Sequence, residues 1–231
     1  MRVLLAETNW NAMTAAAGLV DAGLLVTRVN DGAEMLDFAK FGEQSAIVFD
    51  LDLPHMNGFD LLARLRDDHP LLPIYVLCAS DDWAVRKRAF ELGVDDVLAG
   101  PVNPDYLAAQ IKAAVRRTYG YTCAELTVGD MALDLDHQIA RINGKALHLT
   151  RKEYEILEML VLQRERLVTR EAFMSHLYAW DDEPDPRIIN VYLSRIRQQI
   201  EACGGDGEMV QTVWGLGYRI TARTDNAQAA A

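Results

Sequence analysis

The first 118 residues alternate short apolar runs with segments of helical periodicity, and this alternation constrains the fold more than any other feature. The apolar runs are Val3–Ala6, Leu24–Thr27, Ala46–Phe49, Ile74–Leu77 and Val97–Leu98. The segments with apolar residues at helical spacing are Asn9–Ala22, Ala33–Phe41, Phe59–Asp67, Asp82–Leu92 and Pro104–Thr118. Because a strand is followed by a helix five times in succession, the pattern predicts a parallel sheet with helices on both faces.

The acidic residue Asp50 directly follows the third apolar run, at the predicted carboxyl end of a buried strand. In open parallel sheets, ligands bind outside the carboxyl ends of the strands. Asp50 is therefore a candidate for a working chemical site. The alternative is that Asp50 is only a solvated residue where the strand ends, and the pattern alone leaves both interpretations open.

The pattern changes after residue 118. The segment 119–124 has no periodicity and is predicted to be a linker. Residues 125–149 hold brief alternating segments, with a hairpin signal at Asn143-Gly144. The elements expected after them are a helix from a capping box at Thr150 and Glu153 to about Gln163, a helix at Arg170–Ala179, a polar loop at Trp180–Asp185, a helix at Pro186–Ala202 and a hairpin at Met209–Ile220. This order predicts a winged helix-turn-helix domain over residues 125–222, followed by a flexible tail at 223–231.

The predicted helix Pro186–Ala202 is basic on one side, although the chain as a whole has a formal net charge of −11. Its apolar residues fall at helical spacing and predict one buried stripe: Ile189, Leu193, Ile196 and Ile200. Arginine and amide side chains on the other side match the base edges and phosphates of a DNA major groove. A solvated basic face is the alternative, but the helix-turn-helix context favours DNA binding.

Composition limits the remaining classes of protein. The apolar runs are too short to span a bilayer, and the N-terminus lacks a signal-peptide pattern, so a cytoplasmic protein without a membrane partner is expected. The three cysteines have no CxxC spacing, so neither a disulfide framework nor a zinc site is indicated. The strong negative charge argues against DNA binding by the whole surface, so any basic element must be local.

Several motifs together resemble those of the OmpR/PhoB family of two-component response regulators. They are DLDLPHMNG at Asp50–Gly58, GVDD at Gly93–Asp96, LTRKEYEILEML at Leu149–Leu160 and TVWGLGYRI at Thr212–Ile220. Within that family, DEPDPRIINVYLSRIR at Asp182–Arg197 resembles the version found in cell-cycle regulators. The resemblance implies an α/β chain with a flavodoxin-like (βα)5 receiver at 1–118 and a winged-helix DNA-binding domain at 125–222.

The resemblance places Asp50 at the position that accepts a phosphoryl group, but the positions around it are degenerate. Receivers of this family hold Mg²⁺ with an acidic pair, of which Glu7 is present and Thr8 is not acidic. Cys78 replaces the usual hydroxyl residue, and Gly100 replaces the usual lysine. Since a thiol is a weak donor and glycine carries no charge, the groups that would neutralise a phosphoryl group are mostly missing. We therefore expect Asp50 to be weakly phosphorylated or unused, with at most weak Mg²⁺ binding by Glu7 and Asp50 and no other cofactor.

Two arguments give the candidate DNA-binding residues. Helical spacing places Asn190 and Val191 on the side opposite the buried stripe, together with Arg187, Ser194 and Arg195. The resemblance implies that Arg187, Tyr192, Ser194, Arg195 and Arg197 touch DNA and that Trp214 and Arg219 lie on the wing. The implied partner is double-stranded promoter DNA. RNA polymerase and a histidine kinase are further partners that the family brings into consideration.

The mixed-charge segments Asp82–Leu92 and Pro104–Thr118 correspond to the face through which receivers of this family form symmetric dimers. Gln110 stands where a basic residue is usual. The leading hypothesis is a transcription regulator, not an enzyme, whose receiver dimerises or binds partners independently of phosphorylation. The alternatives are a phosphorelay regulator that uses Asp50 and a protein that titrates another regulator without binding DNA.

Overall fold

The computed structural model describes residues 1–41, 43–178 and 184–222, and these form two compact units. The chain divides between Thr122 and Cys123, within the segment 119–124 that the sequence indicates as a linker. The expected tail at 223–231 and most of the expected loop at 180–185 lie outside the described residues. Among the helices of the described residues, none is both long and apolar enough to cross a membrane.

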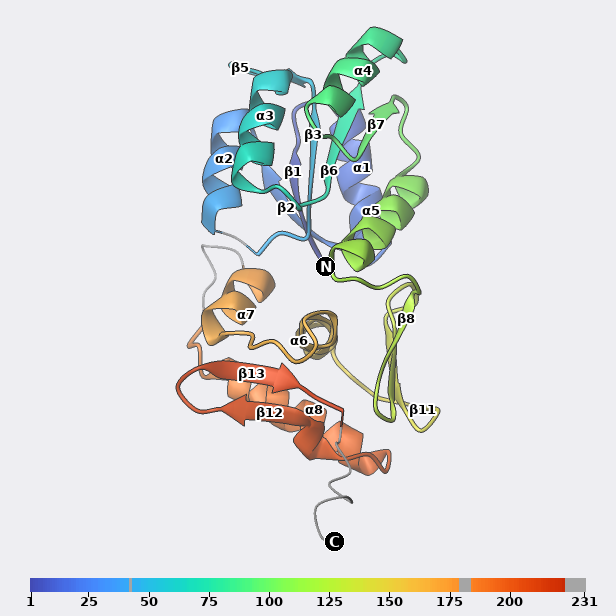
Figure 1. The fold of residues 1–231 in the computed structure, drawn as a ribbon, viewed down its shortest axis with the longest axis vertical. Helices are drawn as coiled ribbons and strands as arrows, with labels where there is room; N and C mark the ends of the chain where they lie inside the picture. The colour runs from blue at the N-terminus through green and yellow to red at the C-terminus, as the bar shows by residue number, and fades with distance from the viewer. Residues whose placement is uncertain (42, 179–183, 223–231) are drawn as a thin grey trace, which may run out of the picture. The chain divides into compact units, whose positions relative to one another are not determined.

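The N-terminal unit is built on a five-stranded parallel sheet in the order β2-β1-β3-β6-β7 (Figure 1). Its strands are β1 (Arg2–Ala6), β2 (Leu25–Val29), β3 (Ala46–Asp50), β6 (Ile74–Cys78) and β7 (Asp96–Ala99). Strands β1, β3 and β6 are buried along their whole length, which explains why they appear in the sequence as continuous apolar runs. The predicted parallel sheet is therefore confirmed.

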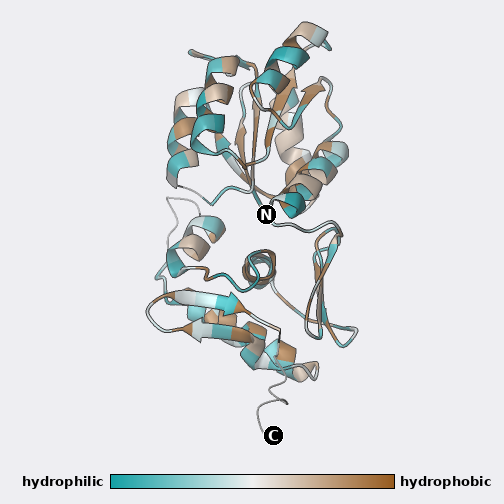
Figure 2. Ribbon diagram, in the orientation of Figure 1, coloured by the Kyte–Doolittle hydropathy of each residue, from teal (hydrophilic) through white to brown (hydrophobic). Residues whose placement is uncertain are grey.

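Five helices cover this sheet on both faces. They are α1 (Trp10–Asp21), α2 (Gly32–Phe41), α3 (Gly58–Asp68), α4 (Trp83–Glu91) and α5 (Pro104–Thr118). Figure 1 shows α2 and α3 on one side of the sheet and α1 and α5 on the other, and α1 packs against α5. The alternation of apolar and polar colours along α3 and α5 in Figure 2 corresponds to their buried and exposed faces.

A small antiparallel pair, β4 (Asp52–Leu53) and β5 (Met56–Asn57), follows β3 and was not expected from the sequence. Each of its strands has only two residues, which is too short to produce a periodic pattern. The pair places the backbone amide of Asp52 close behind the end of β3, where it contributes to the acidic site.

The C-terminal unit begins with a four-stranded antiparallel sheet in the order β11-β10-β9-β8. Its strands are β8 (Glu125–Val128), β9 (Met131–Asp134), β10 (Ile139–Ile142) and β11 (Lys145–Ala146). The hairpin between β10 and β11 turns at Asn143 and Gly144, which have φ values of 50° and 78°. Positive φ at both central residues is typical of a type I′ turn, so the predicted Asn-Gly hairpin is confirmed.

Three helices and a hairpin complete this unit. They are α6 (Arg151–Leu162), α7 (Arg170–Leu177), α8 (Ile188–Ala202), the short 3₁₀ helix η1 (Gly207–Met209) and the strands β12 (Val210–Val213) and β13 (Gly217–Ile220). Thr150 and Glu153 form the predicted capping box at the start of α6. Helix α8 begins at Ile188 instead of Pro186, and η1 was not predicted, because a single turn leaves no periodic signal.

Candidate acidic site and nucleic-acid interface

The carboxylate of Asp50 is buried at the carboxyl end of β3, where its side chain is held by two neutral donors. Asp50 has an exposed fraction of 3%. Its Oδ1 accepts a hydrogen bond of 3.0 Å from the backbone amide of Asp52, and its Oδ2 accepts one of 2.8 Å from Nδ2 of Asn9. The interpretation of Asp50 as a merely solvated residue at a strand end is therefore wrong, because the side chain is buried and ordered by specific contacts.

The sequence analysis missed Asn9, which lies between β1 and α1. Its Oδ1 caps α1 by accepting from the backbone amide of Ala12 at 3.0 Å, while its Nδ2 donates to Asp50. The available signal was an asparagine directly before an apolar helical pattern, which is a typical N-cap. The same side chain thus caps α1 and donates a hydrogen bond to the buried carboxylate of Asp50.

The other two positions of the expected acidic cluster are not arranged as magnesium ligands. Oε2 of Glu7 forms an ion pair of 3.1 Å with Nη1 of Arg28 on β2, and Oγ1 of Thr8 is buried without a hydrogen-bond partner among the described residues. Mg²⁺ is bound best by carboxylate and water oxygens in octahedral geometry. Since one carboxylate is neutralised by arginine and the second position offers only a hydroxyl, these residues do not fit a magnesium ion well.

Cys78 and Gly100 lie at the ends of the neighbouring strands. Sγ of Cys78 is a weak donor, 3.2 Å from the carbonyl oxygen of Ser80, and the backbone amide of Gly100 donates to the carbonyl oxygen of Cys78 at 2.8 Å. Burial raises the pKa of the Cys78 thiol, and the nearby charge of Asp50 raises it further. A neutral thiol and a glycine supply neither the hydroxyl nor the cation that would hold a phosphoryl group.

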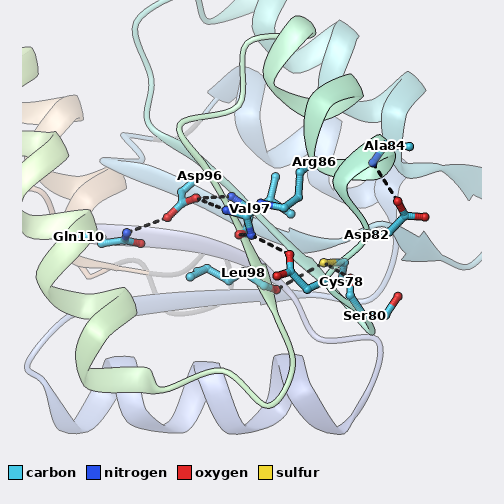
Figure 3. A network of polar contacts seen from close by, with 10 residues as sticks. Cys78, Ser80, Asp82, Ala84, Arg86, Asp96, Val97, Leu98 and Gln110 are labelled. Atoms are coloured by element: carbon cyan, nitrogen blue, oxygen red, sulfur yellow. Dashed lines mark hydrogen bonds and ion pairs between the residues drawn. The ribbon is translucent and has the colours of Figure 1, made fainter.

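Arg86 on α4 links the helix to β7 (Figure 3). The sequence placed Arg86 only among the mixed charges of the segment Asp82–Leu92 and did not indicate this contact. Its Nη1 donates to the carbonyl oxygen of Val97 at 2.8 Å and lies 3.3 Å from Oδ1 of Asp81. Its Nη2 is 3.6 Å from Oδ1 of Asp96, whose Oδ2 accepts from Nε2 of Gln110 at 2.7 Å. Asp96 is thus already engaged by two side chains of its own unit.

Other charges on the same face are also paired within the chain. Oδ2 of Asp95 contacts Nη2 of Arg66 at 3.0 Å and accepts from the backbone amide of Ile74 at 2.8 Å. Lys87 and Glu91 on α4 form an exposed pair of 3.5 Å. The face expected to form a dimer through charges therefore has fewer unengaged carboxylates than the sequence implied.

In the C-terminal unit, α8 carries the expected buried stripe and an exposed basic face. Ile189, Leu193, Ile196 and Ile200 are fully buried, as predicted. The predicted DNA-binding residues that the structure leaves exposed are Arg187, Asn190, Val191, Ser194, Arg195 and, on the hairpin, Trp214. Those that are half-buried are Tyr192, Arg197 and Arg219. The arrangement suits insertion of a helix into a groove with the hairpin beside it.

Arg197 joins α8 to the hairpin. Its Nε donates to the carbonyl oxygen of Val210 at 2.8 Å, and its Nη2 donates to Oγ1 of Thr212 at 2.8 Å. By contrast, Arg195 has an exposed side chain with one long ion pair, 3.7 Å, to Glu153. The side chain of Arg197 is therefore held by the hairpin, whereas that of Arg195 is available to contact DNA. Their spacing along the helix did not indicate this difference.

A groove of about 440 Å³ lies between α8, the start of α7 and the hairpin. The residues that line it include Arg170, Asn190, Arg197, Trp214 and Tyr218. Trp214 has an exposed fraction of 91% and stands at the hairpin turn. The groove has basic and amide side chains together with an exposed aromatic ring, a combination that suits contact with a nucleic-acid backbone and its base edges.

Gly217 allows the hairpin to approach the loop before α7. Its φ is 142°, and a Cβ atom there would collide with the carbonyl oxygen of Val168. Tyr218, which follows Gly217, exchanges backbone hydrogen bonds of 2.8 and 2.9 Å with Val168. A side chain at position 217 would therefore push the hairpin away from the loop before α7.

Two other predicted residues make local contacts. The hydroxyl groups of Tyr192 and Tyr178 are 3.1 Å apart, and this hydrogen bond, followed by burial, raises the pKa of Tyr192. Nε of Arg219 donates to Oε1 of Gln211 on the opposite strand at 2.8 Å. Both side chains are thus ordered at the edge of the exposed face.

Comparison with known families assigns both units. Residues 3–112 match the family described as "Response regulator receiver domain", and residues 144–220 match the family described as "Transcriptional regulatory protein, C terminal". The matches correspond to the parallel-sheet unit and to most of the helix-and-hairpin unit.

Similar proteins match the whole chain. The cell cycle transcriptional regulator CtrA of Caulobacter vibrioides is 35% identical over 231 residues, covering 100% of both chains. The cell cycle response regulator CtrA of Brucella anthropi is 35% identical over 219 residues, covering 94% of both chains. Among solved structures, DrrB, an OmpR/PhoB homolog of Thermotoga maritima, aligns over 95% of this chain and 98% of its own, with 26% identity and a TM-score of 0.45.

Proposed function

This chain belongs to the OmpR/PhoB family of response regulators, in its CtrA-like group, and we propose that it regulates transcription without phosphorylation of its receiver. It is a DNA-binding transcription regulator and not an enzyme. In the proposal, residues 1–118 are a receiver with a degenerate site, 119–124 are a linker, and 125–222 bind promoter DNA. The cytoplasm is the compartment we infer for it.

The proposal that phosphorylation is not needed rests on the hydrogen-bond partners of the Asp50 carboxylate. Both of its oxygens accept hydrogen bonds from neutral groups, Nδ2 of Asn9 and the amide of Asp52. Transfer of a phosphoryl group to a carboxylate requires cations or donors that stabilise the added negative charge. Here Glu7 is paired with Arg28, and Cys78 and Gly100 offer little to a phosphoryl oxygen.

For DNA recognition we propose that different residues of α8 contact base edges and the phosphate backbone. Arg195 and Asn190 are exposed and face outward, so we assign them to base edges in the major groove. Arg187, Val191, Tyr192 and Ser194 would complete the contacts of the helix, while Trp214 and Arg219 would contact the backbone from the hairpin. Arg197, which is held by the hairpin, would contact a phosphate or act by keeping the hairpin in place.

We also propose that the receiver dimerises through α4 and α5. The support is a set of exposed side chains: Phe90 and Tyr106 have exposed fractions of 47% and 55%, and Lys87 and Glu91 are exposed beside them. Because Asp95 and Asp96 are engaged internally, this dimer would depend more on apolar contact than on cross-subunit ion pairs. RNA polymerase is a further partner in this proposal, whereas a histidine kinase is not required.

The test uses the full chain in mobility-shift titrations on a duplex selected by the protein itself. Wild type and Asp50→Ala, each with and without prior incubation with acetyl phosphate and Mg²⁺, should bind with the same affinity and footprint. Phosphate incorporation should be measured on the same samples by intact mass. Stoichiometric modification of Asp50 that strengthens DNA binding would replace this proposal with the phosphorelay alternative.

A further inference from the structure

We infer that Tyr218 is a positioning residue that orients the side-chain amide of Asn190 for DNA, so that the NH₂ group of Asn190 faces the bases. The inference rests on the proposed role of Asn190 as a base-reading residue and adds the group that sets its orientation. Tyr218 lies on β13, 28 positions along the chain from Asn190 on α8. Its hydroxyl group is hydrogen-bonded to Oδ1 of Asn190 at 2.5 Å.

The ring of Tyr218 is fixed in place. Its exposed fraction is 3%, and its centroid lies 6.0 Å from that of Phe173 with an interplanar angle of 51°. Its backbone is paired in both directions with Val168. The hydroxyl group is therefore presented at one point in the groove, and a flexible side chain such as that of Asn190 adjusts to it.

The direction of the hydrogen bond follows from the atom of Asn190 that faces Tyr218. Oδ1 of Asn190 can only accept, so the hydroxyl group of Tyr218 donates to it. Nη2 of Arg170 lies 3.5 Å from the hydroxyl oxygen of Tyr218 and can only donate, which is compatible with this direction because it uses a lone pair and leaves the hydroxyl hydrogen to Asn190. Asn190 thus turns its carbonyl oxygen, and not its NH₂ group, toward Tyr218.

This orientation leaves the NH₂ group of Asn190 as the part of the amide available to DNA. Asn190 is exposed, and within the described residues no partner of its Nδ2 is seen. Two N–H donors match the N7 and O6 acceptors of guanine in the major groove, whereas two-point recognition of adenine needs both the oxygen and the nitrogen of an asparagine amide. We therefore expect a preference for guanine over adenine at the base that Asn190 reads.

The experiment selects duplexes from a random-sequence pool with the full chain and compares the base frequencies at each position. The proteins are wild type, Asn190→Ala, Tyr218→Phe and the double variant. Asn190→Ala should flatten one position, where wild type favours guanine. Tyr218→Phe should reduce the guanine-to-adenine ratio at that same position by about fivefold or more, the lower end of the effect of one base contact. In the Asn190→Ala background, Tyr218→Phe should change nothing further at that position.

Three results of the selection experiment would overturn the inference, and they are distinguishable. If Asn190→Ala changes no position, Asn190 does not read a base and the proposed role itself fails. If Asn190→Ala flattens a position that Tyr218→Phe leaves intact, only the positioning role fails. A wild-type preference for adenine at that position would contradict the orientation of the amide.

A matched variant separates positioning from general damage to the fold. Tyr154→Phe removes another hydroxyl group in the same unit, one that donates at 3.1 Å to the carbonyl oxygen of Asp134 on β9 and not to a residue of α8 or the hairpin. Thermal unfolding of Tyr218→Phe and Tyr154→Phe should be similar, and only Tyr218→Phe should change base selection. A loss of affinity for all sequences alike in Tyr218→Phe would show a structural role and overturn the inference.

Discussion

Nδ2 of Asn9 donates a hydrogen bond of 2.8 Å to Oδ2 of Asp50, and this contact joins the start of α1 to the end of β3. The amide is neutral, so it satisfies the buried carboxylate without adding the positive charge that a phosphoryl group would need. Glu7 is paired to Arg28, so both carboxylates of the receiver site, Glu7 and Asp50, have partners within the chain. In the proposed function the receiver site lacks the groups that phosphoryl transfer needs.

Restoring the three missing groups should restore phosphorylation. We expect wild type to gain no stable adduct from acetyl phosphate with Mg²⁺, whereas the triple variant Thr8→Asp, Cys78→Thr and Gly100→Lys should gain one. The variant supplies the second acid, the hydroxyl and the cation that an acyl phosphate needs for stabilisation. Intact mass spectrometry measures the adduct. A Cβ atom at Gly100 would lie 3.2 Å from Nδ2 of Asn11, so only a small side-chain movement is required.

The same triple variant with Asp50→Asn is the control and should gain no adduct. An adduct on wild type, or one that survives Asp50→Asn, would contradict the account of which groups are missing.

Asn9→Ala should destabilise the receiver more than the loss of an ordinary helix cap. The substitution removes the cap of α1 and also leaves one oxygen of a buried carboxylate without a donor. A cap contributes about 0.5–2 kcal/mol, and a hydrogen bond to a charged group adds about 1.5–3 kcal/mol. Urea unfolding measures the change in the free energy of unfolding.

Asn57→Ala is the matched control, because Asn57 caps α3 by accepting from the amide of Phe59 at 2.9 Å, as Asn9 caps α1. Equal losses in Asn9→Ala and Asn57→Ala would show that the contact with Asp50 contributes nothing to stability.

Cys78 should be an unreactive thiol. Burial, followed by the charge of Asp50, raises its pKa above the ordinary value of 9.0, so little thiolate is present at neutral pH. Peptide mapping after brief iodoacetamide treatment should show modification of the exposed Cys123 well before that of Cys78. Faster labelling of Cys78 than of Cys123 in the folded protein would contradict this prediction.

The raised pKa of Cys78 also contributes to how the stability of the protein depends on pH. Because the folded state holds the Cys78 proton more tightly than the unfolded chain, its contribution to stability is fully present below pH 9.0 and is lost as the pH rises through the raised folded value. Cys78→Ala should therefore lose less stability than wild type between neutral pH and pH 10. Parallel unfolding curves for the two proteins across that range would exclude the effect.

The fold was predictable because its elements carry strong local signals. The buried strands β1, β3 and β6 appear as apolar runs, and the stripe on α8 appears at helical spacing. The absence of an acid at Thr8 and of a lysine at Gly100 could be read directly from the sequence. Such features depend on residues close together in the chain.

The contacts that complete each site were not predictable, because they join residues far apart in the sequence. Asn9 and Asp50 are 41 positions apart, and Arg86 reaches the carbonyl oxygen of Val97 on another element. Charge patterns indicated which residues were ionised but not which partner each would find. For that reason the dimer face seemed richer in unpaired charges than it is.

Arg195 and Arg197 are two positions apart on α8, yet we expect their substitution by alanine to have different effects on stability and on DNA binding. Arg197→Ala leaves the carbonyl oxygen of Val210 and the hydroxyl of Thr212 without their shared donor, so the free energy of unfolding should fall by about 1–3 kcal/mol. Binding should weaken on selected and random duplexes alike, because the hairpin is no longer held beside the helix.

Arg195→Ala removes an exposed side chain with one long ion pair, so the free energy of unfolding should hardly change. The free energy of binding should weaken by about 1–3 kcal/mol on the selected duplex and by little on random DNA. Titrations at several salt concentrations decide between these roles. If Arg197→Ala unfolds like wild type and lowers the salt slope by about 0.9, Arg197 contacts a phosphate directly and the hairpin does not depend on it.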